Sequence, residues 1–140
     1  MSKPRLRTIH AAIAIIERRG RYLICQRRSG DSLGGYWEFP GGKRETGESW
    51  EACLRRELRE ELGVAVRAVR AYGRMRYRYP DGIVSFKIFR CAIARGRPQP
   101  LDAQALRWIP LNRLRWYRFP PANQPLVERL LRKIASGRPS

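Results

Sequence analysis

Alternating hydrophobic and polar residues predict β-strands over much of the chain. The segment 7–28 predicts two strands that flank a turn at residues 19–21. In the first strand every second residue from Ile9 to Ile15 is apolar, which predicts one apolar face. Further strands are predicted at 36–39, 64–79, 82–94 and 105–111, with a turn at 79–82.

Two segments carry apolar residues at helical spacing. Leucines recur at steps of four from Leu54 to Leu62, so we expect a helix over residues 49–62. Ser49 is its expected N-cap and Gly63 its stop. A second helix is expected over residues 122–135. Mixed strands with two helices predict an α/β domain in layers.

The length of 140 residues suits one domain with a single sizeable core. We expect that domain to span residues 1–136, with residues 137–140 as a disordered tail. The segment 29–48 is rich in glycine and is expected to be a loop apart from its short strand. The sequence contains no internal repeat and no evident linker.

The composition adds a strong positive charge. The chain has 30 Lys and Arg against 12 Asp and Glu, a formal net charge of +18, and almost all of the basic residues are arginine. Because the arginines are spread along the chain, they indicate either a bias of the solvated surface or attraction to polyanionic ligands, nucleotides included. No apolar run approaches the roughly 20 residues that span a bilayer, which argues against a membrane protein.

Cysteine and histidine usage limits the possible chemistry. Cys25, Cys53 and Cys91 are far apart and odd in number, which fits neither a zinc site nor a disulfide framework. We expect buried free thiols in a reducing, cytoplasmic compartment. His10 is the only histidine, so a histidine cluster for a metal is excluded and a structural role is expected.

The acidic residues are concentrated in one segment, since seven of the 12 lie between Glu38 and Glu61. On the predicted helix, Glu57, Glu60 and Glu61 share an arc of about 100°. Carboxylates this close raise one another's pKa unless a cation neutralises them, and their oxygens select hard cations such as Mg²⁺ or Mn²⁺. The alternative is a surface helix with Glu–Arg pairs at i,i+4 spacing.

The loop before the helix decides between these alternatives, because a solvated helix has no need for its spacing. Five residues separate Gly42 from Glu48, and seven more separate Glu48 from Arg56. The segment resembles the signature of the Nudix hydrolase family, matched by Gly42, Glu48, Arg56, Glu57, Leu58, Glu60, Glu61, Gly63 and Val64. The resemblance implies an α/β/α sandwich with a mixed sheet between helices. It also implies hydrolysis of a nucleoside diphosphate linked to another group, with Mg²⁺ or Mn²⁺.

The resemblance assigns roles to individual residues. Arg56 is expected in the catalytic set, where it would hold the glutamates in orientation. Asp102 falls where related enzymes have a metal-associated glutamate. The general base varies in the family, so both Glu57 and Asp102 stay open for it. The implied metal ligands are the Gly41 carbonyl, Glu57, Glu60, Glu61 and Asp102.

A second stretch, FPPAN at 119–123, bears on the substrate. Taken alone, Asn123 before a helix is an ordinary N-cap. The stretch is similar, however, to one in Nudix members that hydrolyse 8-oxo-dGTP, whose matching asparagine recognises the oxidised base; members that prefer CTP are expected to have Asp there. The likeness extends to residues 37–43 and 79–81. The implied substrate-binding residues are Arg27 near the phosphates, Glu38, Phe39, Tyr79 and Asn123.

The chemistry of the base agrees with this role for an asparagine. Oxidation at C8 turns guanine N7 from an acceptor into an N–H donor while O6 stays an acceptor, so one amide can pair with both. We therefore expect hydrolysis of 8-oxo-dGTP to 8-oxo-dGMP and pyrophosphate by a monomer, which would sanitise the nucleotide pool. The alternatives are another Nudix substrate, such as dCTP, CTP or an RNA 5′-triphosphate end, or a non-catalytic nucleic-acid-binding module. The charge permits nucleic-acid binding but does not require it.

Overall fold

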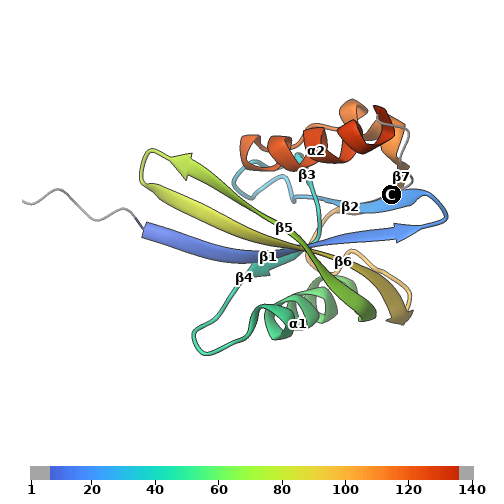
Figure 1. Ribbon diagram of the computed structural model, residues 1–140, viewed down its shortest axis with the longest axis horizontal. Helices are drawn as coiled ribbons and strands as arrows, with labels where there is room; N and C mark the ends of the chain where they lie inside the picture. The colour runs from blue at the N-terminus through green and yellow to red at the C-terminus, as the bar shows by residue number, and fades with distance from the viewer. Residues whose placement is uncertain (1–6, 136–140) are drawn as a thin grey trace, which may run out of the picture.

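The computed structural model describes residues 7–135, which form a mixed β-sheet between two helices (Figure 1). α1 (Trp50–Leu62) covers one face of the sheet and α2 (Gln124–Ala135) the other. The expected α/β/α sandwich is therefore confirmed, whereas the expected tail at 137–140 lies outside the described residues. The strands are β1 (Arg7–Arg18), β2 (Arg21–Gln26), β3 (Trp37–Glu38), β4 (Gly41–Lys43), β5 (Ala65–Tyr79), β6 (Gly82–Arg95) and β7 (Ala105–Pro110). The 3₁₀ turns η1 (Leu111–Trp116) and η2 (Pro121–Asn123) lead into α2.

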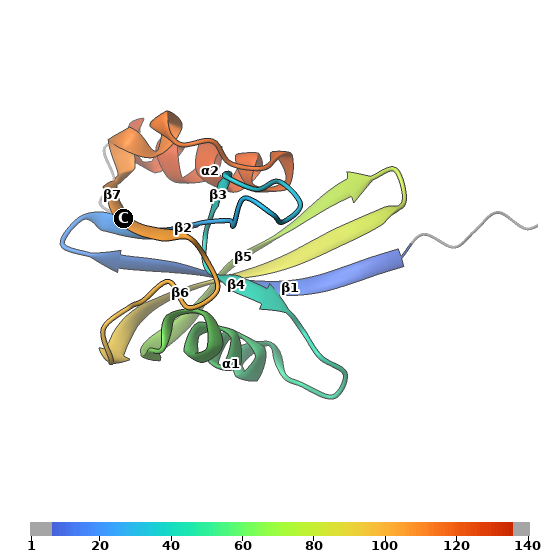
Figure 2. The ribbon, with the colours of Figure 1, turned by 180° about the vertical axis from the view of Figure 1, so that it is seen from behind.

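β1 is the central strand of the sheet. It pairs in parallel with β6 and in antiparallel with β2 and β4. The strand order is β3-β2-β1-β6-β5, with β4 paired to β1 and β7 paired to β2. β5 and β6 form a long antiparallel hairpin whose turn lies far from the centre of the sheet (Figure 2). This topology brings the glycine-rich strand β4 beside β1, next to α1.

β1 differs from the expected strand with a single apolar face, because residues 11–16 are all buried. Ile13 and Ile15 belong to the core that includes the buried residues of α2. Ala12 and Ile16 belong to the core that includes the leucines of α1. A strand between two layers of helix has no solvent-exposed face. The alternating isoleucines therefore predicted only one of the two buried faces of β1.

α1 begins and ends where the sequence predicts. The Ser49 hydroxyl accepts a hydrogen bond from the Ala52 amide at 3.1 Å, which satisfies a free N–H of the first turn. Gly63 ends the helix with a φ of 71°, in the left-handed region that favours glycine. Leu54, Leu58 and Leu62 are fully buried. Glu57 and Glu61 lie beside this leucine stripe and face β4.

β4 lies inside the segment that was expected to be a loop. Glycines have little strand preference, so only the pairing of Gly41–Lys43 with β1 makes this segment a strand. Gly41 has a φ of 150°, and a Cβ there would collide with the Ala12 carbonyl oxygen. Glycine is therefore required for β4 to approach β1. The prediction of a loop was wrong here because pairing with β1, a tertiary contact, makes the segment a strand.

The structure bears on several smaller predictions. Cys25, Cys53 and Cys91 are buried free thiols, and burial raises the pKa of both Cys53 and Cys91 to about 11. The His10 ring meets the Trp50 ring edge-on at 5.8 Å, which agrees with a structural role. Within residues 7–135 no helix is long and apolar enough to cross a membrane.

Candidate active site

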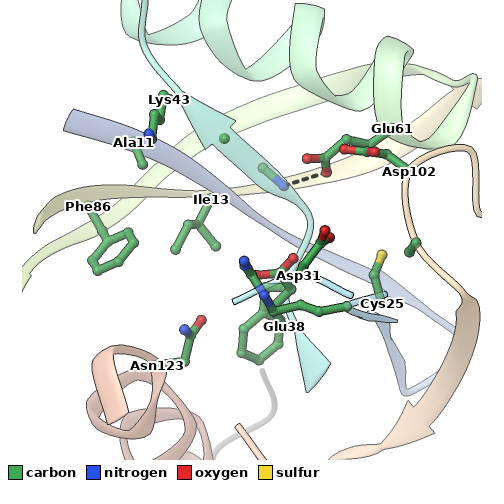
Figure 3. Close-up of a pocket in the computed structure, with 15 residues that line it drawn as sticks. Ala11, Ile13, Cys25, Asp31, Glu38, Lys43, Glu61, Phe86, Asp102 and Asn123 are labelled. Atoms are coloured by element: carbon green, nitrogen blue, oxygen red, sulfur yellow. Dashed lines mark hydrogen bonds and ion pairs between the residues drawn. The ribbon is translucent and has the colours of Figure 1, made fainter. Parts of the chain in front are cut away.

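A cavity of about 290 Å³ lies where β1, β3, β4 and β6 meet the end of α1 and the start of α2 (Figure 3). One part of the cavity is lined by Gly41, Gly42, Glu61 and Asp102. We call this part the carboxylate end, and we include in it the adjoining network of Glu48, Arg56, Glu57 and Glu60, which does not itself line the cavity. The other part, the amide end, contains Ile13, Phe86 and Asn123. Predicted site residues on the wall of the cavity are Arg27, Glu38, Phe39, Gly41, Glu61, Asp102 and Asn123.

Arg56 ties the loop before α1 to the helix. Its guanidinium donates to both oxygens of Glu48, at 2.7 and 3.0 Å. It also donates to Glu57 at 2.9 Å and to Glu60 at 3.2 Å. A further bond of 3.0 Å to the Lys43 carbonyl oxygen joins β4 to the same network. Arg56 thereby orients three glutamates at once, as its fork of donors allows.

Glu48 has a role that the sequence analysis did not assign. Hydrogen bonds from Arg56 are the main reason that its pKa falls to about 2, so the carboxylate stays ionised at neutral pH. The Glu45 amide also donates to it at 3.1 Å. Glu48 is therefore a positioning residue that holds Arg56 in place. The fixed position of Glu48 in the Nudix signature was the sequence signal that could have suggested its pairing with Arg56.

Gly42 brings β4 into contact with α1. A Cβ on Gly42 would collide with the Glu57 carboxylate, so any other residue would displace that side chain from its present position. The Cys53 thiol lies 3.6 Å from the Gly42 carbonyl oxygen and closes the same interface. Glu57 is consequently packed against backbone, with only 15% of its side chain exposed.

Glu61 is the buried acid of the carboxylate end. Burial raises its pKa to about 8, opposed in part by a hydrogen bond of 3.1 Å from the Gly41 amide. Glu57, Glu38 and Asp102 lie near enough to raise that pKa further. Figure 3 shows the carboxylates of Glu61 and Asp102 side by side. A cation at this place would stabilise the ionised form of Glu61.

The donor chemistry of the carboxylate end fits a hard divalent cation. Carboxylate oxygens of Glu57, Glu61 and Asp102 gather there, and within residues 7–135 Glu61 has no ion-pair partner. In the described part of the chain no three His, Cys, Asp or Glu side chains yet converge as a metal site. The contacts account for this, because Arg56 holds Glu57 and Glu60, and the Glu60 side chain is 59% exposed.

Asn123 is the polar group of the amide end. Its backbone N–H donates to the Pro120 carbonyl at 2.9 Å, which fixes the η2 turn and the direction of the side chain. The residue is only 9% exposed, and its amide points into the cavity (Figure 3). Within residues 7–135 that amide forms no hydrogen bond with the protein, so it does not act as a helix N-cap. The amide is therefore free to pair with a ligand in the cavity.

Apolar side chains surround this amide. Phe39 is buried and stacks on Phe119 with 5.3 Å between ring centroids. Ile13 and Phe86 form the opposite wall in Figure 3. Tyr79 is not among the residues that line the cavity, and its ring packs against Tyr77 near the β5–β6 turn. The structure therefore brings Phe39 to the site and leaves Tyr79 outside the cavity.

Arg27 and Glu38 form an ion pair at the mouth of the cavity. The guanidinium donates to Glu38 at 2.9 Å and, through Nε, to the Ser32 carbonyl at 2.8 Å. Burial raises the pKa of Glu38, and the Arg27 charge lowers it in part. Lys43 adds a second cationic side chain to the lining. Both cations are placed where they can meet the phosphates of a nucleotide.

Comparisons with known proteins agree with the signature and the fold. A family model described as the NUDIX domain matches residues 11–129. An 8-oxo-dGTP diphosphatase of Haemophilus influenzae is 36% identical over 124 residues, which cover 88% of this chain and 91% of the relative. A CTP pyrophosphohydrolase of Escherichia coli is 35% identical over 136 residues, which cover 96% and 99%.

Solved structures give the same result. The Escherichia coli ORF135 protein superposes with a TM-score of 0.79 at 33% identity and covers 94% of both chains. A structure of MutT, determined for the proteins of Aliivibrio salmonicida and Vibrio cholerae, has a TM-score of 0.74 at 32% identity and covers 89% of this chain and 96% of its own. With the signature folded into β4 and α1 around a cavity, the chain belongs to the Nudix hydrolase family.

Proposed function

We propose that this Nudix hydrolase cleaves 8-oxo-dGTP to 8-oxo-dGMP and pyrophosphate and thereby sanitises the nucleotide pool. The observation that carries the proposal is the Asn123 amide, which points into the apolar end of the cavity and forms no hydrogen bond with residues 7–135, while the other end is carboxylate-rich. The 8-oxo-dGTP diphosphatase and MutT relatives at 32–36% identity support it.

The amide end suits an oxidised guanine. The Asn123 oxygen can accept from N7–H while its NH₂ donates to O6, so the base would pair with an amide that has no partner among residues 7–135. Unmodified dGTP presents two acceptors there, so one of them meets the amide oxygen. A site built around such a donor can reject the base that lacks it. Phe39, Ile13 and Phe86 supply apolar contact area for the ring.

The carboxylate end suits the triphosphate. Arg27 and Lys43 bind phosphate oxygens from the cavity wall. Glu57, Glu61 and the Gly41 carbonyl would hold Mg²⁺ or Mn²⁺, which when bound polarises phosphoryl oxygens and lowers the pKa of water. A water oxygen bonds to the β-phosphorus, and the bond from that phosphorus to the α–β bridging oxygen breaks. Glu57 and Asp102 are the candidates for the carboxylate that takes the proton of the water.

A second candidate function is hydrolysis of CTP or dCTP. The relative named as a CTP pyrophosphohydrolase covers 96% of this chain, more than the 8-oxo-dGTP diphosphatase of similar identity. Cytosine presents an N–H₂ donor beside a ring acceptor, so an asparagine amide can pair with it too. Sequence identity alone does not separate the two substrates.

The test is kcat/KM for 8-oxo-dGTP, dGTP, CTP and dCTP in Mg²⁺, with the released phosphates identified. We expect 8-oxo-dGTP to exceed dGTP by at least about a hundredfold, with pyrophosphate as the product. A ratio near one against dGTP would contradict the proposal. A higher value for CTP or dCTP than for 8-oxo-dGTP would replace it with the second candidate.

A further inference from the structure

Four basic side chains lie together on one face of the β5–β6 hairpin. Arg74 is directly opposite Lys87, Arg76 is opposite Ser85, and Arg78 is opposite Ile83. Residues opposite each other in an antiparallel pair, and residues two apart along a strand, lie on the same face of the sheet. We call Arg74, Arg76, Arg78 and Lys87 the basic sheet face.

The basic sheet face lies on the α1 side of the sheet. Lys87 is two residues from Phe89, which belongs to the core against α1, and its ammonium lies 5.4 Å from the centroid of that ring. Phe86 points to the other side, into the cavity that contains Asn123. In both ribbon views the hairpin extends past the N-terminal end of α1 (Figures 1 and 2). The helix therefore does not reach the outer part of this face.

The positive charges of this face are not neutralised by the protein. In the part of the chain that the structure describes, none of the four residues forms an ion pair, and Asp81 at the hairpin turn forms none with them. Like charges directly opposite in a sheet are destabilising, and Arg74 and Lys87 are such a pair. The arrangement becomes favourable when an external anion lies across it.

Further groups border the face where it meets α1. His10 on β1 is paired with Ser85 in the parallel register. Its ring contacts Trp50, and the Arg44 guanidinium lies 4.8 Å from the centroid of the Trp50 ring. Cationic and aromatic groups thus continue from the hairpin towards the helix, a combination that suits phosphates and bases of a nucleic-acid strand.

The spacing of the arginines narrows the type of anion. Alternate residues of a strand are about 7 Å apart, so Arg74, Arg76 and Arg78 form a straight row of evenly spaced cations. A row of this kind matches a linear polyanion better than a single phosphate. A membrane surface fits less well, since the large exposed apolar side chains among the described residues, Ile9, Leu33, Leu101 and Trp116, are not part of this face.

We propose that the basic sheet face binds the phosphate backbone of a single-stranded nucleic acid, separately from the nucleotide cavity. The strand runs along β5, with Arg74, Arg76 and Arg78 on successive phosphates and Lys87 beside Arg74. Because the amide end of the cavity lies on the other side of the sheet, a bound strand leaves the access of a base to Asn123 unchanged.

The experiment compares two variants that lose the same charge. R74T/R76T/R78T removes the arginine row, and threonine keeps strand preference. R67T/R95T/R97T removes three exposed arginines around the opposite end of the same hairpin. The probe is a fluorescein-labelled oligothymidylate of 20 nucleotides, and binding is followed by anisotropy over a series of salt concentrations. Circular dichroism and thermal melting confirm that both variants fold.

We expect the arginine-row variant to bind about tenfold or more weakly, with the slope of log K against log salt reduced by about 2, since each phosphate contact on a single strand adds about 0.7. The control variant and R74K/R76K/R78K are expected to bind nearly as the natural protein, because phosphate contacts tolerate a point charge. Equal losses in the two threonine variants, or no binding by the natural protein, would overturn the proposal. Binding to phosphatidylserine vesicles that depends on the row, without oligonucleotide binding that does, would assign the face to membranes and also overturn it.

A second measurement separates this proposal from the proposed activity. Saturating oligothymidylate is expected to leave kcat/KM for nucleotide hydrolysis unchanged, and the arginine-row variant is expected to hydrolyse nucleotides as the natural protein does. Competitive inhibition by the oligonucleotide would place it in the cavity and would contradict a separate surface. Failure of the 8-oxo-dGTP preference would leave the result of the anisotropy comparison unaffected.

Discussion

The two ends of the cavity are built in opposite ways. At the carboxylate end, Glu48, Glu57, Glu60 and Arg56 come from one loop and one helix and share hydrogen bonds. At the amide end, Ile13, Phe86 and Asn123 come from β1, β6 and η2, and the Asn123 amide has no hydrogen-bond partner in the described part of the chain. The carboxylate network is thus encoded by one short segment of the sequence. Selectivity for a base would depend instead on segments that are far apart in the chain.

The two constructions also predict different responses to substitution. Removal of one charge at the carboxylate end leaves its partners unbalanced, because a network of ionised groups is coupled. At the amide end the contacts are separate, so a substitution there changes the ranking of bases and leaves the phosphate chemistry largely in place. Four substitutions or conditions test this contrast, from the largest expected effect to the smallest.

Glu57→Gln is expected to lower kcat by about a thousandfold, since it removes a carboxylate expected to hold the metal and to contact the reacting phosphates, worth about 4 kcal/mol of barrier. The measurement is steady-state hydrolysis with saturating Mg²⁺. Glu51→Gln is the matched control, because Glu51 lies on the same helix and pairs only with Arg55. Similar activity of the two variants would show that the carboxylate end is not the reactive one.

Asn123→Ala is expected to reduce the preference for 8-oxo-dGTP over dGTP by about a hundredfold, because it removes the amide that pairs with N7–H and O6. The loss should fall on 8-oxo-dGTP, since dGTP gains little from the amide. Asn112→Ala, at an exposed position of η1, serves as the control. An unchanged ratio of kcat/KM would mean that selectivity comes from another part of the cavity.

Arg56→Lys is expected to lower kcat/KM by about tenfold or more, because a lysine cannot hold Glu48 with two bonds while reaching Glu57. Combination with Glu48→Gln should cost much less than the product of the two single losses, which identifies a shared positioning role. Arg59→Lys is the control, as Arg59 lies exposed on the same helix. Strictly multiplicative losses would refute coupling through this pair.

The pH dependence of stability gives the smallest effect. The pKa of Glu61 is about 8 in the folded protein, above the value of about 4.3 for an unfolded glutamate. The protonated Glu61 therefore contributes to the stability of the folded state at low pH, and this contribution is lost as pH rises through 8. Melting of the metal-free protein should therefore occur at lower temperature near about pH 9 than near about pH 6, with Mg²⁺ restoring more stability at the higher pH. Glu61→Gln should flatten this dependence. A Mg²⁺ effect that is equal at both pH values would contradict it.

The features that the sequence predicted correctly are likewise the local ones, and those that it missed depend on distant segments. The helix at 49–62, its Ser49 cap and its buried leucines were predicted correctly, because capping and periodicity act over a few residues. β4 was missed, since its strand state depends on pairing with β1. The Arg56–Glu48 pairing was left open, because the seven intervening residues of loop and helix do not define it. Tyr79 was expected at the substrate and lies instead in the hairpin, outside the lining of the cavity.

The sequence by itself determined the acidic helix, the glycines before it and the position of Asn123 ahead of the last helix, since spacing and turn chemistry are local properties of the chain. Only the tertiary structure decided that the Asn123 side chain points into the cavity, that burial raises the pKa of Glu61 to about 8, and that four basic residues share one face of a hairpin. Hydrogen-bond partners, desolvation and strand register arise from segments far apart in the sequence, and folding alone brings those segments into contact.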